Sequence, residues 1–201
     1  MISPLSAAVS TAADSGFYVG ANAGYAGFPS DTHFNFSFPA ETFSSSELHT
    51  HATAWGFDGG YRFNRYFAVE GGYTNFGRLS GQLTTGPVGS GSQGEFDYGV
   101  SAVKVGVVGT LPFGNWEVFG KLDLTMEDIR LTASGETGTG SFRLRRSDRS
   151  FAPLEGVGVG YNFNDHWSAK LEFDHAGPFG NTHEAGRATV NVGLVGIYYR
   201  F

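Results

Sequence analysis

The sequence contains no cysteine, which excludes disulfide bonds, thiolate metal sites and cysteine nucleophiles. Charged residues are scarce, at 16% of the 201 residues against roughly 25% in ordinary soluble domains. No stretch reaches the ~18 apolar residues of a membrane-spanning helix, so a helical membrane protein is excluded. Only 13 residues are Lys or Arg, against 19 Asp or Glu, and the net charge of −6 argues against nucleic-acid binding.

Glycine and aromatic residues are abundant instead, with 31 glycines and 15% aromatics. This much glycine is poor material for helices but suits twisted, closely packed strands. Apolar and small or polar residues alternate with period two, which predicts strands with two unlike faces. The alternating segments are 17–28, 55–63, 67–74, 100–111, 116–126, 156–163, 167–174 and 194–201. Of these, 100–111 is ambiguous because both of its faces are apolar around Lys104. Counting it, we expect an all-β fold of eight antiparallel strands.

The connections between these segments differ in length. Short turns are expected at 64–65, 112–115 and 164–165, where turn-forming residues gather. Long polar links are expected near 29–50, 78–95, 132–150 and 176–187. Short turns at one end and long loops at the other are typical of up-and-down transmembrane β-barrels of bacterial outer membranes.

The aromatic residues follow the same plan. On the apolar face, at the strand ends beside the short turns, lie Phe17, Tyr61, Phe63, Phe67, Trp116, Tyr161, Phe163, Trp167, Tyr199 and Phe201. A ring of amphipathic aromatics at one level predicts a membrane interface. Tyr25, Trp55, Tyr73 and Phe173 predict a second, looser ring about 20 Å away, since a strand rises ~3.3 Å per residue and tilts by ~40°.

The opposite strand faces carry small and charged residues. A soluble barrel of lipocalin type would turn the apolar face inward, whereas a membrane barrel turns it toward lipid. An eight-stranded barrel has an interior that ordinary side chains just fill, so the glycine-rich face fits inside better than the aromatic face. The interior charged network is then predicted to comprise Asp58, Arg62, Glu70, Lys104, Lys121, Lys170, Glu172 and Arg200. It could form a narrow ion path or, as we favour, a plug of paired charges.

Three further features are candidates for chemistry. Arg143, Arg145, Arg146 and Arg149 form a basic cluster that could contact lipopolysaccharide phosphates, because arginine forks suit phosphate. His49 and His51 could share a face, with His33 and Glu47 in the same link, but a solvated loop is favoured over a metal site. His166 and Ser168 resemble the His-x-Ser pair of lipid A deacylases, yet they abut a short turn. We therefore predict no catalytic residue, no metal ligand and no cofactor.

Four segments carry a family resemblance. GFYVGANAGY at 16–25, GYRFNRYFAVEGGYTNFG at 60–77, APLEGVGVGYNFNDHWSAKLEFDH at 152–175 and GIYYRF at 196–201 resemble the transmembrane domain of outer-membrane protein A and its small-barrel relatives. The resemblance implies an eight-stranded barrel with a charged interior network, in which Glu70, Lys104 and Lys170 match family positions. Tyr199 and the terminal Phe201 resemble the assembly signal read by the barrel-insertion machinery.

Two positions depart from the family pattern. Gly160 stands where relatives often have an acid, so the charge pairing must differ here. Glu155 occupies a lipid-side position that is usually apolar. It is expected either to lie above the membrane or to be turned inward by a bulge.

These observations define the expected protein. Residues 1–15 are either a disordered tail or the remnant of a secretory signal peptide, and residues 16–201 form the barrel. We expect a monomeric protein of the Gram-negative outer membrane, with long loops extracellular and short turns periplasmic. Its expected role is structural, with envelope integrity and loop-mediated adhesion to a surface ligand. A narrow porin-like pore or small-solute conduit is the alternative, and a lipid A-modifying enzyme a remoter one.

Overall fold

The computed structural model of the protein describes residues 15–27, 35–37, 42–48, 51–84, 93–137, 140–179 and 188–201. The expected N-terminal tail of residues 1–15 lies outside this part of the chain, except for Ser15. Among the described residues, no helix is long and apolar enough to cross a membrane.

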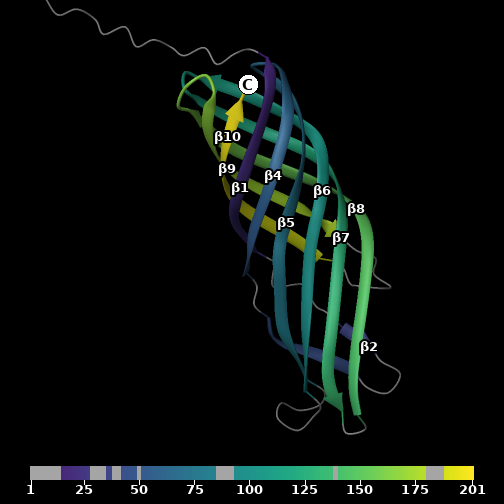
Figure 1. Ribbon diagram of the computed structural model, residues 1–201. Coiled ribbons are helices and arrows are strands. Elements are labelled where there is room, and N and C mark those ends of the chain that lie inside the picture. Colours follow the sequence, from purple (N-terminus) through teal and green to yellow (C-terminus); the bar gives the residue numbers. More distant parts are fainter. Residues whose placement is uncertain are drawn as a thin grey trace, which may run out of the picture.

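Ten β-strands form within the described residues, and all of them pair antiparallel. Their bounds are β1 Gly16–Gly27, β2 Asn35–Ser37, β3 Thr42–Leu48, β4 His51–Asn64, β5 Phe67–Thr84, β6 Gln93–Phe113, β7 Trp116–Thr137, β8 Gly140–Asn162, β9 Trp167–Phe179 and β10 Ala188–Arg200. Strand β1 pairs with both β4 and β10, and the pairing of β5 with β6 closes the ring. β1 and β4 to β10 are therefore the eight strands of a closed up-and-down barrel, and the predicted fold is confirmed (Figure 1).

Two of the three tight turns at the end where the C-terminus lies share one local design (Figure 1). After β4, the side-chain oxygen of Asn64 accepts hydrogen bonds from the backbone N–H groups of Tyr66 (2.8 Å) and Phe67 (3.0 Å). After β8, Asn164 does the same for His166 (2.9 Å) and Trp167 (2.8 Å). Such Asx turns explain why the chain reverses within a few residues at these positions.

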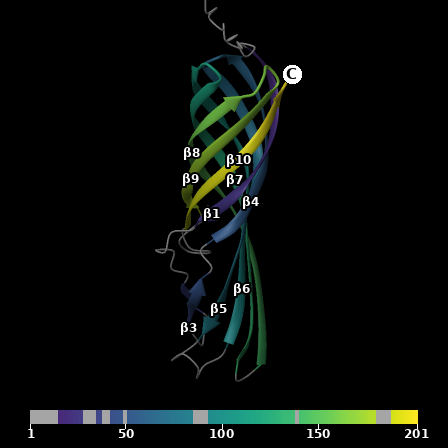
Figure 2. The same ribbon diagram turned by 90° about the vertical axis from the view of Figure 1, so that its left-hand side faces the viewer.

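The other end of the barrel differs from expectation. Residues 78–95 and 132–150 were expected as polar links, but β5 runs to Thr84, β6 starts at Gln93, and β7 and β8 pair as far as Thr137 and Gly140. The four strands β5 to β8 thus project beyond the rest of the barrel, with β3 added at the edge of β5 (Figures 1 and 2).

This projection has a physical reason in the sequence. The period-two alternation of strand residues continues through this polar stretch. Its evidence is that the side chains of Leu79, Tyr98, Ile129 and Leu131 all lie on one face of the sheet and are buried. Their neighbours in sequence are charged or polar, and the charged residues made the stretch resemble a loop. We call the projecting parts of β5 to β8 the projecting sheet, which comprises residues 75–84, 93–101, 128–137 and 140–149.

Candidate functional site

The barrel's outer surface carries the first aromatic ring. All ten predicted members lie at the end with the tight turns, and most are largely exposed, for example Phe17 at 65% and Trp116 at 57%. They contact one another edge to face, with centroid distances of 4.8 Å for Phe17–Tyr61 and 5.0 Å for Trp167–Tyr199. Such packing fixes the orientation of amphipathic rings in a continuous girdle.

An apolar belt follows on the same outer face. Exposed side chains such as Leu122, Leu124 and Val195 cover the strands as far as the second ring, where Trp55 and Tyr73 lie 5.8 Å apart. A soluble protein rarely exposes a continuous apolar surface of this extent, which is typical of a membrane-facing wall.

The belt ends abruptly on the long strands. Along β6 the outward residue after Val103 is Ser101, and along β7 the one after Met126 is Asp128. Glu155 stays on the outer face of β8, beside His175 of β9, in a ladder without a register shift, so no bulge turns it inward. Glu155 is therefore a polar residue in the outer wall of the barrel.

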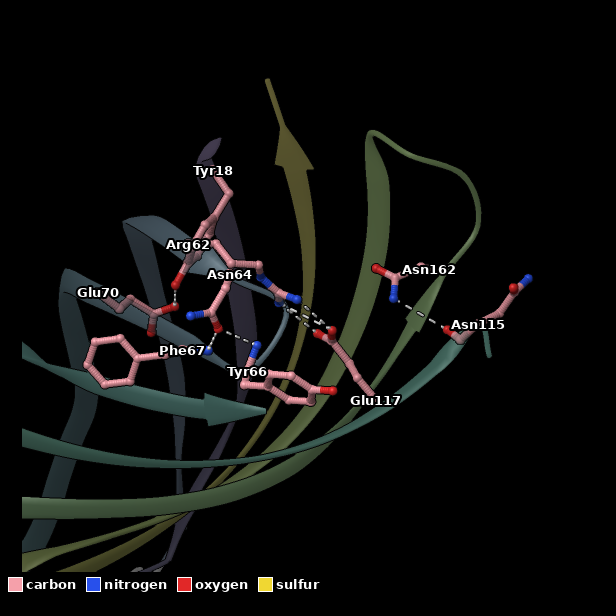
Figure 3. A network of polar contacts seen from close by, with 9 residues as sticks. All are labelled: Tyr18, Arg62, Asn64, Tyr66, Phe67, Glu70, Asn115, Glu117 and Asn162. Carbon is pink, nitrogen blue, oxygen red and sulfur yellow. Dashed lines mark hydrogen bonds and ion pairs between the residues drawn. The ribbon is translucent and has the colours of Figure 1, made fainter. Parts of the chain in front are cut away.

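The interior holds the predicted charged residues. Each of them exposes at most 7% of its surface: Asp58, Arg62, Glu70, Lys104, Lys121, Lys170, Glu172 and Arg200. Arg62 pairs with Glu117 near the tight turns, with Nη1 3.2 Å from Oε2, as Figure 3 shows. One layer deeper, Lys104 Nζ lies 2.9 Å from Asp58 Oδ1.

Asp58 is held by three partners. Besides Lys104, it accepts hydrogen bonds from the Asn22 amide at 2.6 Å and from the Tyr198 hydroxyl at 3.0 Å. These three donors come from β6, β1 and β10, so one carboxylate ties three strands to its own strand, β4. A buried carboxylate with this many donors is compensated for its loss of water.

Lys121 forms the densest part of the network. Its ammonium contacts Glu172, and it lies 3.1 Å from Asp174 Oδ2 and 3.7 Å from Asp123 Oδ2. All four side chains expose at most 6% of their surface. One cation therefore compensates several buried carboxylates. We expect its removal to destabilise the barrel more than the removal of any other charge in the network.

Glu70 and Lys170 depart from the expected pairing across the lumen. The Tyr18 hydroxyl donates to Glu70 at 2.8 Å, while Lys170 Nζ lies over the rings of Tyr198 (4.2 Å), Tyr18 (5.1 Å) and Phe119 (5.1 Å). Among the described residues, no ion pair joins either of them to an opposite charge. Lys170 is stabilised by cation–π contacts instead.

Glycine makes room for these rings. A Cβ at Gly20 would run into the ring of Tyr198, and one at Gly158 would run into the ring of Phe119. The interior is thus shaped by glycines facing large rings, a pairing that the sequence pattern did not predict.

Several interior residues were missed by sequence reasoning. They are Tyr18, Asn22, Glu117, Asp123, Asp174 and Tyr198, all buried. The alternation placed the acids on the inner face, and that signal could have found them. The same alternation placed Tyr18 and Tyr198 on the inner face, but the predicted network included only charged residues.

Beyond the charged layers, the lumen becomes apolar. Buried apolar side chains begin there and continue onto one face of the projecting sheet. The largest are Phe76, Leu79, Tyr98, Val100, Ile129, Leu131, Leu154, Val190, Val192 and Leu194, and we call them the apolar cap. Tyr98 lies on the projecting sheet, where burial, together with the carboxylates of Glu127 and Asp148, raises the pKa of its hydroxyl. The hydroxyl therefore stays neutral.

The remaining candidates are not brought together. Ser168 is buried in the lumen, whereas His166 is exposed in the turn, its ring stacked on Tyr199 with centroids 5.8 Å apart. The alternation would direct both side chains inward, but the turn rotates His166 out of the ladder. Of the histidine group, His33 and His49 lie outside the described residues, Glu47 lies on β3, and His51 is exposed. No set of three metal-ligating side chains occurs in the part of the chain that the structure describes.

The basic cluster lies on a strand rather than in a loop. Arg143, Arg145 and Arg149 point to the outer face of β8, opposite Ser134, Thr132 and Asp128 of β7 respectively. Arg146 pairs in register with the buried Leu131, so it occupies the other face. The predicted cluster is therefore split between two faces, because adjacent residues of a strand point in opposite directions.

Comparisons with known proteins agree with this geometry. A protein of Coxiella burnetii is 24% identical over 215 residues, which cover 92% of this chain and 85% of that protein. The structure of Neisserial surface protein A is similar, with a TM-score of 0.59 and 15% identity over 92% of this chain and 97% of that one.

The outer membrane protease OmpT of Escherichia coli has a TM-score of 0.51 at 11% identity, covering 98% and 99% of the two chains. At these identities the two solved structures support the fold alone. The sequence model of the OmpA-like transmembrane domain matches residues 12–201, and the chain therefore belongs to this family of outer-membrane β-barrels.

Proposed function

We propose that the protein is a closed structural barrel of the outer membrane, which holds a projecting sheet outside the membrane for contact with surfaces. The observation that carries this proposal is the filled lumen. Charged layers around Arg62, Asp58 and Lys121 occupy the half near the tight turns, and the apolar cap fills the other half and continues onto the projecting sheet. Water and ions would have to cross both.

A small hollow lies inside the barrel near the tight turns. It has a volume of about 10 Å³ and lies between Tyr18, Arg62, Lys170, Tyr198 and Arg200. That volume has room for about one water molecule. This supports a plug over the alternative of a narrow pore or small-solute conduit. A lipid A-modifying activity has less support, since Ser168 and His166 do not share a site.

The orientation follows from the two ends of the barrel. In bacterial barrels of this kind the short turns face the periplasm and the long connections face outward. We therefore place the projecting sheet outside the cell and the first aromatic ring at the periplasmic interface. Tyr199 and Phe201 are outward-facing residues at the end of β10, where insertion machinery could bind them as the assembly signal. A monomer suffices, because the barrel closes within one chain.

An epitope insertion tests this orientation. A tag placed in the β7–β8 connection should bind antibody on intact cells, and a tag placed at Asp165 should bind only after the outer membrane is opened. The reverse pattern would overturn the orientation.

Shortening the projecting sheet tests the surface role. Residues 135–142 are replaced by Asn-Gly, a two-residue turn that suits the paired residues Ser134 and Arg143. The matched control replaces Asn164-Asp165 by Asn-Gly at the other end. We expect the first variant to lose attachment of cells to coated surfaces while keeping resistance to detergent, and the control to keep both. Unchanged attachment in the first variant would contradict the surface role.

A further inference from the structure

A hollow opens on the outer wall of the projecting sheet. Its volume is about 390 Å³, and it begins at Tyr73 of the second aromatic ring. Its charged lining consists of Arg78, Arg130, Arg145, Asp97 and Asp128, from the four neighbouring strands β5 to β8. Two of its lining residues, Gly77 and Gly99, have no side chain, which leaves space there.

A β-bulge builds this hollow. Asn75 pairs with Ser101 but Arg78 pairs with Gly99, so β5 holds an extra residue there. Gly77 has φ +87°, a conformation that favours glycine, and its N–H donates to the Asn75 side chain at 2.8 Å. The bulge reverses the alternation of β5.

The consequence for Arg78 is decisive. Phe76 is buried in the apolar cap, so without the bulge Arg78 would point to the same side. With the bulge, Leu79 is buried in the cap instead, and Arg78 is exposed on the outer wall beside Arg130 and Arg145. Bulges often aim a side chain in this way beside a binding site.

The hollow lies directly past the apolar belt. Its lining residues Ser101 and Asp128 are the first polar outward residues after Val103 and Met126. In a membrane, that is the level of the lipid headgroups, where phosphate groups are found. This step rests on the proposed placement of the belt in the bilayer.

The charges of the hollow favour an anion. Asp128 is already paired with Arg130, whose Nε lies 2.9 Å from Oδ1. Three arginines against two aspartates leave one net positive charge, on a chain whose net charge is −6. Guanidinium forks bind phosphate through paired hydrogen bonds, and Asp97 could accept from a sugar hydroxyl.

We propose that this hollow binds the phosphate-bearing headgroup of lipid A in the outer leaflet. The arginines would hold the phosphate, while the acyl chains would lie along the apolar belt below Tyr73. The hollow, rather than the wider basic cluster of β8, is then the lipid site, and Arg145 is the one residue that belongs to both.

Native mass spectrometry of the detergent-folded protein tests the proposal. The probes are lipid A with both phosphates and the same lipid A after removal of its phosphates. In the variant Arg78→Gln/Arg145→Gln we expect binding of the phosphorylated form to weaken at least about tenfold, because two charge-assisted contacts are lost. The control Arg143→Gln/Arg146→Gln removes the same charge outside the hollow and should bind as the wild type does.

A variant that fills the hollow separates the effect of its volume from the effect of its charges. At Gly99 an added Cβ would meet Arg78 Cγ at 3.7 Å, an ordinary contact, so Gly99→Val should fold while occupying the space. We expect it to weaken lipid A binding with every arginine still present. A heat-dependent gel shift confirms that each variant is folded.

Three results would overturn the proposal. The first is that lipid A binding weakens equally in the hollow variant and the control variant. The second is that lipid A binds equally well with and without its phosphates. The third is that a heparin oligosaccharide, and not lipid A, binds in a way that depends on the hollow. The measurement uses purified protein and does not depend on orientation in the cell, so it can fail while the epitope test succeeds, and the reverse.

Discussion

Replacing Lys121 by methionine should strongly destabilise the barrel. The substitution keeps the length of the side chain but leaves the carboxylates of Glu172, Asp174 and Asp123 buried without their cation. Removing one partner of a buried ion pair typically costs about 3–5 kcal/mol, and Lys121 has several such partners. We therefore expect a loss of at least about 3 kcal/mol in the free energy of unfolding.

Urea unfolding in phospholipid vesicles, followed by the fluorescence of the three tryptophans, measures this loss. The matched control is Arg130→Gln, which breaks an ion pair whose arginine side chain is 77% exposed. An exposed pair contributes at most about 1 kcal/mol, so the control should change little.

Adding Glu172→Gln to Lys121→Met should recover part of the lost stability, because one uncompensated charge is removed. If Lys121→Met is as stable as the wild type, the charged layers do not hold the lumen together and the reasoning fails.

Three further substitutions probe other parts of the molecule. Ile129→Ala in the apolar cap should cost about 2–5 kcal/mol in the same urea assay, and a loss below that range would mean that the cap is loosely packed. Tyr198→Phe removes the hydroxyl that donates to Asp58 but keeps the ring over Lys170, so a cost of about 1–3 kcal/mol is expected. Phe201→Ala should slow insertion by the assembly machinery in a reconstituted assay while leaving the unfolding midpoint nearly unchanged, since the backbone bond from Phe201 to Phe17 remains. Equal insertion rates would contradict the assembly role.

Much of the barrel was predictable from the sequence because period two is a local property. The outward direction of Trp116 and Trp167 and the inward direction of Asp58 and Glu172 follow from the alternation and a choice of face. That choice could be made because rings at so many positions would overfill an eight-stranded interior.

The partners inside the lumen could not be predicted in the same way. Which carboxylate meets which cation depends on the stagger between strands, which no local pattern reveals. Lys170 lies between the rings of Tyr198 on the next strand and Tyr18 on β1, which is far away in sequence. The length of the projecting sheet was missed because charged residues such as Arg143 and Arg145 resemble a loop when the buried partners on β7 are unknown.

The outer-wall hollow was missed for a different reason. A β-bulge shifts the alternation by one residue. The sequence pattern alone would therefore direct Arg78 inward, whereas in the structure it points outward. Gly77 after Asn75 is the signal that could have indicated it, since glycine and asparagine favour such a conformation.

Single-channel recording in planar bilayers tests the closed lumen most directly. With the purified, folded protein we predict insertion without steady channel openings at neutral pH, because the charged layers and the apolar cap both fill the lumen. Lys121→Met and Ile129→Ala should be recorded beside the wild type to show that a damaged plug can be detected. Stable, reproducible openings of the wild-type protein would contradict the closed barrel and favour the narrow pore.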